Sequence, residues 1–269
     1  MLQHCLTVIP ARYGSTRFPA KPLALLHGQP MILHTLQRVM ESELRQGTVV
    51  VATDDSRIAD VVQQAGFHAQ LTRHDHDTGS DRVWEVATHY PEATWIVNVQ
   101  GDEPFIPPVH LNTLAVRMQQ ATDRTEMLTL VCPLQRLATT PEALLELYHN
   151  PNCVKALVSH QGQALYFTRA AAPFVRDGWT PELLLQPSLP VYRHVGLYAY
   201  RRSALQAFVQ APPSALEQLE KLEQLRALEL GLRIEVGFVE SLPHGVDTPD
   251  DLAVLNAQAL TQLLDKPAV

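Results

Sequence analysis

Short hydrophobic runs and amphipathic stretches alternate along most of the chain. Apolar runs rich in β-branched residues predict strands at residues 5–9, 49–53, 69–72, 94–99, 127–132, 195–200 and 234–238. Apolar residues at helical spacing predict helices at residues 31–44, 57–65, 81–89, 109–120 and 215–231. Strands that alternate with helices are typical of an α/β fold, in which helices cover both faces of a mostly parallel sheet.

The stretch from 133 to 194 departs from this regular alternation. Its elements are shorter, and prolines interrupt them: Pro141, Pro151, Pro173, Pro181, Pro187 and Pro190. We therefore predict an α/β core made of residues 1–132 and 195–269, with a smaller inserted lobe at 133–194.

Leucine recurs at every third position in the predicted helix 215–231, at Leu216, Leu219, Leu222, Leu225 and Leu228. Glu217, Glu220 and Glu223 lie between these leucines. We interpret this pattern as a core-facing helix with a solvated acidic stripe, and a coiled coil is the alternative. Ser214 and Glu217 have the spacing of a capping box, and Gly231 suits the carboxyl end of the helix.

The net charge and the cysteine content of the chain bear on what it binds and where it works. A formal charge of −7 argues against a protein that binds nucleic acid through a basic surface. Cys5, Cys132 and Cys153 lie in or beside apolar runs without a Cys-x-x-Cys motif, which is typical of buried thiols in a reducing compartment. We see no signal peptide before Pro10 and no apolar stretch that could span a bilayer, so we expect a soluble, cytoplasmic protein.

The first predicted strand leads directly into a loop with three cations, Arg12, Arg17 and Lys21. Gly14 and small neighbouring side chains would let backbone N–H groups approach a bound anion, and the cations would supply charge-assisted hydrogen bonds. This combination indicates a polyphosphate site, although the spacing is that of neither a Walker loop nor a Gly-x-Gly-x-x-Gly motif. The alternative is a solvated basic turn.

Polar residues also follow the buried strand 94–99, beginning with Gln100, Gly101, Asp102 and Glu103. Open α/β sheets bind ligands at the carboxyl ends of their strands. A carboxylate at this point could hold Mg²⁺ against phosphate oxygens. A type I turn that uses Asp and Gly for backbone reasons is the alternative.

A second candidate carboxylate, Asp247, comes late in the chain. Thr248 suits a helix N-cap, Pro249 suits the first helical position, and the acids Asp250 and Asp251 complement the helix dipole. Asp247 lies before the cap and is not explained by it. We therefore predict that Asp247 joins Asp102 on one metal ion.

Two other patterns are weaker. The run His74-Asp75-His76-Asp77 looks like a metal cluster, but alternate side chains in a loop diverge and no third ligand at suitable spacing is near, so we favour a solvated loop. Serine or cysteine nucleophile chemistry has no support, because Gly-x-Ser-x-Gly is absent and no cationic neighbours activate a cysteine.

Taken in order, the motifs resemble those of the 3-deoxy-manno-octulosonate cytidylyltransferases, or CMP-Kdo synthetases. The resemblance covers nearly the whole chain through IPARYGSTRFPAKPL, VVVATDD, TGSDRV, VNVQGDEP, ALYFTRA, RHVGLYAY, LEQLR and GVDTPDDL. It implies a nucleotide-sugar-transferase fold, a Rossmann-like three-layer sandwich whose smaller lobe carries much of a homodimer contact. It also implies formation of CMP-Kdo and pyrophosphate from CTP and the acid sugar Kdo, for lipopolysaccharide biosynthesis, with Mg²⁺ as cofactor.

The resemblance also implies a role for individual residues. The CTP phosphates would lie against Arg12, Arg17 and Lys21, and the cytosine against Thr78, Gly79 and Ser80. Asp102 and Asp247 would hold Mg²⁺ and, with Lys21, form the catalytic set. The residues implied for the sugar acid, or for ordering around it, are Arg82, Gln100, Arg169, His194, Tyr198, Glu223 and Gln224. The alternatives are a related nucleotidyltransferase that uses another sugar acid, such as the 8-amino analogue of Kdo, and a catalytically silent nucleotide sensor on the same fold.

Overall fold

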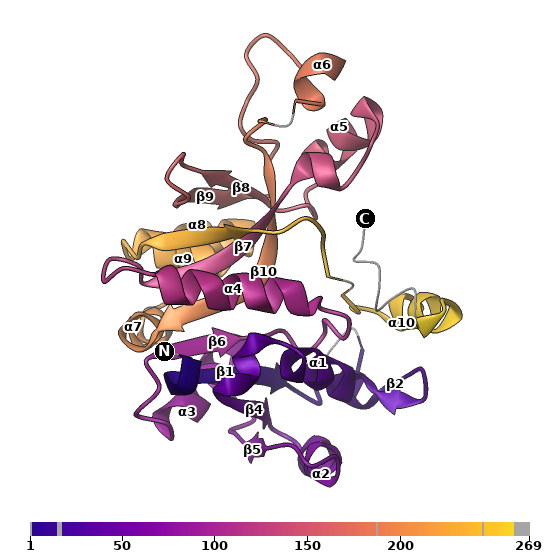
Figure 1. Cartoon of the computed structure of the whole chain (residues 1–269), viewed down its shortest axis with the longest axis vertical. Helices are drawn as coiled ribbons and strands as arrows, with labels where there is room; N and C mark the ends of the chain where they lie inside the picture. Colours follow the sequence, from indigo (N-terminus) through magenta and orange to yellow (C-terminus); the bar gives the residue numbers. More distant parts are fainter. Residues whose placement is uncertain (1, 15–17, 187, 244, 261–269) are drawn as a thin grey trace.

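The computed structural model has one large sheet with helices on both faces (Figure 1). It describes residues 2–14, 18–186, 188–243 and 245–260. The strands are β1 (Cys5–Ala11), β2 (Leu25–Leu26), β3 (Gln29–Pro30), β4 (Thr48–Thr53), β5 (Ala69–Leu71), β6 (Trp95–Asn98), β7 (Met127–Pro133), β8 (Lys155–Val158), β9 (Ala164–Thr168), β10 (Tyr192–Arg201) and β11 (Ile234–Phe238). The α-helices are α1 (Met31–Met40), α2 (Ser56–Gln64), α3 (Gly79–Thr88), α4 (Pro108–Gln120), α5 (Pro141–His149), α6 (Pro181–Leu184), α7 (Arg202–Gln210), α8 (Ala215–Glu220), α9 (Gln224–Glu229) and α10 (Pro249–Ala257).

The sheet is mixed, with the spatial order β11-β7-β10-β6-β1-β4-β5. β1 is parallel to both β4 and β6, β4 is parallel to β5, and β7 is parallel to β11. β10 runs antiparallel to its neighbours β6 and β7. The predicted α/β sandwich is therefore confirmed, with β10 as an antiparallel strand between two groups of parallel strands.

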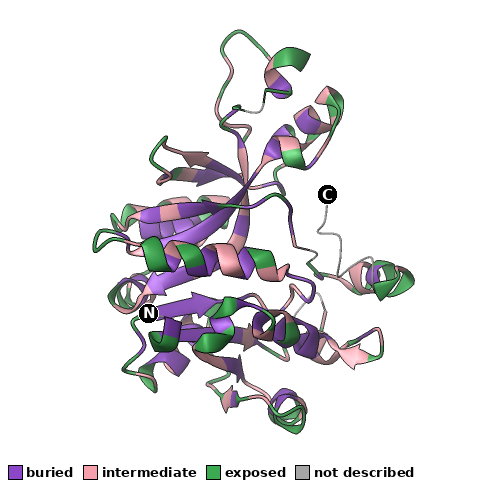
Figure 2. Ribbon diagram, viewed as in Figure 1, coloured by how far each residue is buried: buried purple, intermediate pink, exposed green. Residues whose placement is uncertain are grey.

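Side chains of β1 alternate between the two faces of the sheet and enter two separate cores. Cys5 and Ile9 pack with α1, α2 and α4 on one face, and Leu6 and Val8 pack with α3, α7 and α9 on the other. This alternation follows from the two-residue period of a strand. The central strands are consequently the most buried part of the molecule (Figure 2).

The predicted inserted lobe at 133–194 contains α5, β8, β9 and α6. Helices α5 and α6 project beyond one end of the sheet (Figure 1). β8 pairs with β9 and, through Lys155 and Ala156, with the start of β10, so the hairpin extends the main sheet. The division of the chain at 133 and 194 stays a prediction.

The prediction of one helix over 215–231 is wrong, because the chain forms α8 and α9 with a corner between them. Lys221 ends α8 in a left-handed conformation, with φ of 54°. The predicted solvated acidic stripe is also wrong: Glu217 pairs with Arg226, and Glu220 accepts hydrogen bonds from residues 168 and 169. These tertiary contacts outweigh the helical periodicity of the leucines, and Leu219 is left 81% exposed.

Two helix ends show how local sequence sets the boundaries. The helix predicted over 31–44 ends at Met40, and Ser42 then caps a separate 3-10 turn at Glu43–Gln46. Thr248 caps α10 with Pro249 in its first turn, as predicted.

Within the described part of the chain, no helix has both the length and the apolar character needed to cross a bilayer.

Candidate active site

A cavity of about 300 Å³ lies where the carboxyl ends of β1 and β6 meet the start of α3. These two strands are parallel neighbours, and open α/β sheets bind ligands at this edge. The predicted site residues that line the cavity are Arg12, Lys21, Thr78, Gly79, Arg82, Gln100, Asp102 and Glu223. The structure thus brings together residues from four distant segments of the sequence.

A second cavity of about 250 Å³ adjoins the first and shares Gly79, Gln100 and Glu223 with it. The predicted residues Ser80, Tyr198 and Gln224 also line this cavity. The two cavities thus adjoin each other through shared lining residues.

Gly101 lets the loop after β6 approach β1 closely. A Cβ atom at this position would lie 2.6 Å from the carbonyl oxygen of Pro10, well inside van der Waals contact. Any side chain would therefore push the loop after β6 away from β1. This close approach places Asp102 opposite the loop that carries Lys21.

Lys21 is the meeting point of three polar groups. Its ammonium Nζ lies 2.8 Å from Oδ2 of Asp102, 2.8 Å from the carbonyl oxygen of Val246 and 3.9 Å from Oδ1 of Asp247. The backbone N–H of Val246 in turn donates to the carbonyl of Asp102 at 2.9 Å. The predicted catalytic set is therefore assembled around one cation.

The two aspartates have the donor chemistry for a magnesium ion. Both carboxylates lie within 4 Å of the same ammonium group, and oxygen donors are those that Mg²⁺ prefers. Among the described residues, no group of three His, Cys, Asp or Glu side chains converges on a metal site. Mg²⁺ commonly takes one or two carboxylates and completes its coordination with water and substrate phosphates, so two aspartates suffice.

The first turn of α3 faces the first cavity. Thr78 caps the helix by accepting the N–H of Asp81, and the carboxylate of Asp81 accepts the N–H of Thr78. Gly79, the first residue of the helix, lines both cavities. A helix start presents unpaired N–H groups and a positive dipole end, which suit an electron-rich ligand.

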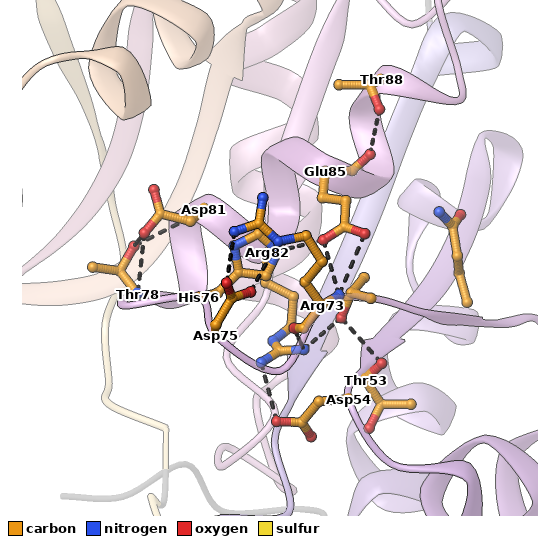
Figure 3. A network of polar contacts seen from close by, with 12 residues as sticks. Thr53, Asp54, Arg73, Asp75, His76, Thr78, Asp81, Arg82, Glu85 and Thr88 are labelled. Atoms are coloured by element: carbon orange, nitrogen blue, oxygen red, sulfur yellow. Dashed lines mark hydrogen bonds and ion pairs between the residues drawn. The ribbon is translucent and has the colours of Figure 1, made fainter.

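Arg82 lines the cavity but is deeply buried, with a side chain only 4% exposed. Its guanidinium pairs with Asp54 and donates to the hydroxyl of Thr72 and to the carbonyl of Arg73 (Figure 3). Several of its five donors are thus engaged with the protein itself.

In the described structure, Arg169 lines neither compartment. Its guanidinium donates to the carbonyls of Glu220 at 2.6 Å and Pro151 at 3.0 Å. These bonds fix the corner between α8 and α9, where Lys221 and Leu222 line the second cavity. A contact between Arg169 and the sugar acid stays a prediction.

His194 sits against the ring of Tyr198, which lines the second cavity. Its Nε2 is 3.0 Å from the hydroxyl of Thr129, and Phe167 packs edge-on against the imidazole. Burial, aided by the charge of Arg193, lowers the pKa of His194 to about 3, so the ring is neutral. It can therefore bond and orient a neighbour but does not serve as a cation.

Glu223 and Ser80 join α9 to α3 across the second cavity, with Ser80 donating to the Glu223 carboxylate at 2.8 Å. Burial is the main cause that raises the pKa of Glu223 above its ordinary value. Of the remaining predicted cations, Arg12 lines the first cavity, and Arg17 lies outside the described residues.

The interpretation of 74–77 as a solvated loop is wrong for His76. The imidazole bonds to the carboxylate of Glu85 on α3 and is only 10% exposed (Figure 3). His76 and Asp77 form part of the wall of the first cavity. Sequence reasoning missed this because the partner lies nine residues away on a helix.

Sequence reasoning also left Glu103 unassigned, although it follows Asp102 directly. Among the described residues, its Oε2 is buried without a hydrogen-bond partner. Burial, together with the nearby charge of Asp102, raises the pKa of Glu103 to about 8. The two adjacent acids therefore differ in environment, and only Asp102 reaches the Lys21 ammonium.

Comparisons with known proteins decide the family. A family model described as Cytidylyltransferase matches residues 6–234. A 3-deoxy-manno-octulosonate cytidylyltransferase of Rhodopseudomonas palustris (strain HaA2) is 45% identical over 92% of this chain and 94% of its own length. The protein of Burkholderia ambifaria (strain MC40-6) named 3-deoxy-manno-octulosonate cytidylyltransferase 2 is 45% identical over 91% and 89%. This chain belongs to the 3-deoxy-manno-octulosonate cytidylyltransferase family.

The fold is that of the family as well. A solved structure of CMP:2-keto-3-deoxy-manno-octonic acid synthetase complexed with CTP superposes with a TM-score of 0.80 at 38% sequence identity. The match covers 94% of this chain and 97% of that one. As a member of this cytidylyltransferase family, the chain is a nucleotidyltransferase, and the recognition made from the sequence motifs is confirmed.

Proposed function

We propose that this chain joins CTP to 3-deoxy-manno-octulosonate to form CMP-Kdo and pyrophosphate. The observation that carries the proposal is the cluster of Asp102, Asp247 and Lys21, in which Lys21 and Asp102 line the first of two adjoining cavities. The family to which the chain belongs, and the CTP named for its solved relative, support the same reaction.

In this reaction a hydroxyl oxygen of the sugar acid loses its proton to solvent and bonds to the α-phosphorus of CTP. The bond from that phosphorus to the bridging oxygen breaks, and pyrophosphate leaves. Arg12 and Lys21 border the first cavity and would neutralise phosphate charge as it shifts to the leaving group. Mg²⁺, when held by Asp102 and Asp247, would add charge neutralisation and lower the pKa of the attacking hydroxyl. The protein thus contributes mainly positioning and electrostatics.

The sugar acid would occupy the second cavity. Gln100, Tyr198 and Gln224 offer amide and hydroxyl groups to its hydroxyls, and Gln100 borders both compartments. The neutral ring of His194 would hold Tyr198 in place, and the hydrogen bond between Ser80 and Glu223 would hold the start of α9. An acceptor held in this way would lie beside the phosphates of CTP.

The decisive experiment measures pyrophosphate release from the purified protein with a panel of nucleotides and acceptors. We expect release only with CTP, Kdo and Mg²⁺ together, with the 8-amino analogue of Kdo included as a competing acceptor. Equal activity with GTP and a hexose 1-phosphate would contradict the proposal.

We also propose that the protein is a cytoplasmic homodimer whose product serves lipopolysaccharide synthesis. Large apolar side chains are exposed in the stretch 133–194, at Leu165, Phe174 and Leu185, and support a contact between copies there. Light scattering on wild type and Phe174→Ser tests the dimer: an unchanged dimer in the variant would remove this surface from the interface.

A further inference from the structure

Asp54 is a carboxylate between two segments that border the first cavity. It directly follows β4, and its side chain is only 14% exposed. Its Oδ1 accepts the backbone N–H of Tyr13 at 3.1 Å, and its Oδ2 accepts Nη2 of Arg82 at 3.2 Å. One side chain therefore links the loop after β1 to the first turns of α3.

Arg82 continues this link to a third segment, the chain between β5 and α3 (Figure 3). Its Nη1 donates to the hydroxyl of Thr72 and, at 3.2 Å, to the carbonyl of Arg73. Glu85, one turn later on α3, accepts the N–H of Arg73 at 3.1 Å. Both backbone polar groups of residue 73 are thus held from one face of the helix.

The segment that is held in this way leads to the wall of the first cavity. His76 bonds to the same Glu85 carboxylate, and His76 and Asp77 line the same cavity as Arg12 and Lys21. A shift of Arg82 or of its partners would therefore change the shape of the compartment that we assign to CTP.

Charge explains why an aspartate is needed at residue 54. A guanidinium that is 4% exposed is costly without an anionic partner, and Asp54 supplies that partner. The next residue, Asp55, has a different role, because it caps α2 and pairs with the exposed Arg57. The two carboxylates of the Thr-Asp-Asp run are adjacent in sequence but separate in function.

We infer that Asp54 and Arg82 form a positioning pair, which sets the loop after β1 and the 72–77 wall at the spacing that CTP requires. The inference rests on the proposed function, and it assigns Arg82 to the CTP side of the site. Arg82 acts through the carbonyl of Arg73 and through Asp54, and it does not have to touch the sugar acid.

The test compares Asp54→Asn with the matched control Asp55→Asn. The asparagine at residue 54 can still accept the N–H of Tyr13 through its carbonyl oxygen. It has no negative charge to offer Arg82, so the ion pair is lost. We expect kcat/KM for CTP to fall about 100-fold, the effect of a misplaced wall, while the KM for Kdo changes little. Asn is as good an N-cap as Asp, so Asp55→Asn should stay within about twofold of wild type.

Arg82→Lys provides a second variant. A lysine keeps the charge beside Asp54 but has no planar fork to reach the carbonyl of Arg73 as well. We expect CTP affinity, measured by calorimetry without acceptor, to fall in both variants. If the KM for Kdo rose in either variant while CTP affinity stayed at the wild-type value, the pair would not position the CTP wall and the inference would be overturned.

The calorimetric readout separates this inference from the proposed reaction. A wild type that binds CTP but transfers nothing to Kdo would overturn the proposed function alone, and the CTP affinities of the variants would still decide the role of the pair. If Asp54→Asn does not fold, as judged by its thermal midpoint, the CTP affinity of Arg82→Lys decides it.

Discussion

The ammonium of Lys21 lies 2.8 Å from a carboxylate oxygen of Asp102, although 81 residues separate the two in the sequence. Their side chains differ in exposure, at 13% for Lys21 and 39% for Asp102. The lysine is thus enclosed while the aspartate remains accessible from the cavity. Lys21 is therefore held by the aspartate while it lines the cavity that we assign to CTP.

Replacement of Lys21 by alanine should therefore damage the use of CTP more than that of Kdo. We expect kcat/KM for CTP to fall by about two to three orders of magnitude, as when a group that stabilises transition-state charge is removed. Kdo binding should change little. Arg136→Ala is the control, because Arg136 is exposed and pairs with Glu240 outside the lining of the cavity. Wild-type kinetics in Lys21→Ala would show that the loop is a solvated basic turn and not a phosphate site.

The two aspartates give a second prediction. Asp102→Asn and Asp247→Asn should each lower turnover by several orders of magnitude, equivalent to about 3–5 kcal/mol in the barrier. The thermal midpoint should move little, because both carboxylates are substantially exposed. Asp250→Asn, in the first turn of α10, is the control and should be nearly silent. Full activity of Asp247→Asn would remove Asp247 from the site.

The parts of the fold that follow from local patterning could be predicted from the sequence. The apolar run of β6 predicts a strand buried on both faces, and all four of its residues are buried. The N-cap Thr248 and the position of Asp247 before it could also be predicted, since capping depends on neighbouring residues. The cationic loop and the acids after β6 are also recognisable as candidate site residues, because each directly follows a predicted strand.

The parts that depend on distant partners could not be predicted. The break at Lys221 depends on the partners of Glu217 and Glu220, which lie on other elements or later in the chain. Asp54 has no visible role in the sequence, because its two partners lie 41 and 28 residues away. The bond of His76 could likewise not be predicted without its partner Glu85. The periodicity of apolar residues indicates which face of an element is buried, but it does not indicate which charged side chains pair with each other.

Arg169 yields a prediction about the sugar acid. Its guanidinium donates hydrogen bonds to the carbonyls of Pro151 and Glu220. The single ammonium group in Arg169→Lys cannot reach both. The corner at Lys221 should then shift and raise the KM for Kdo, with CTP affinity unchanged. Arg202→Lys is a matched control, since Arg202 also donates to two backbone carbonyls, of residues 87 and 90. A rise in the KM for Kdo in both variants would indicate general loosening instead.

The buried pair of Arg226 and Glu217 predicts a large effect on stability. Arg226 donates two hydrogen bonds to the carboxylate, and the side chains are only 5% and 10% exposed. Arg226→Met leaves the Glu217 charge without its partner, so we expect the free energy of unfolding to fall by about 3–5 kcal/mol. Arg57→Met, which removes the exposed pair with Asp55, should have little effect. Chemical denaturation of both variants measures the difference, and equal midpoints would contradict it.

The imidazole of His110 on α4 predicts a loss of stability in acid. Burial lowers its pKa from the ordinary 6.5 to about 4, and its Nε2 lies 3.1 Å from the hydroxyl of Ser241. Below pH 6.5 the unfolded chain takes up a proton at His110 that the folded chain refuses. The stabilisation is therefore complete above pH 6.5 and is lost as the pH falls toward 4.

The size of this loss follows from the difference between the two pKa values. Between pH 7 and pH 4 it should reach about 3 kcal/mol relative to His110→Gln, whose amide does not titrate but can still bond Ser241. His34 and His194 also have lowered pKa values and add their own acid sensitivity, which is common to both proteins and cancels in the comparison. Urea denaturation of wild type and variant at several pH values provides the measurement. Parallel stability curves from pH 7 to pH 4 would show that folded His110 takes up its proton as readily as an exposed histidine.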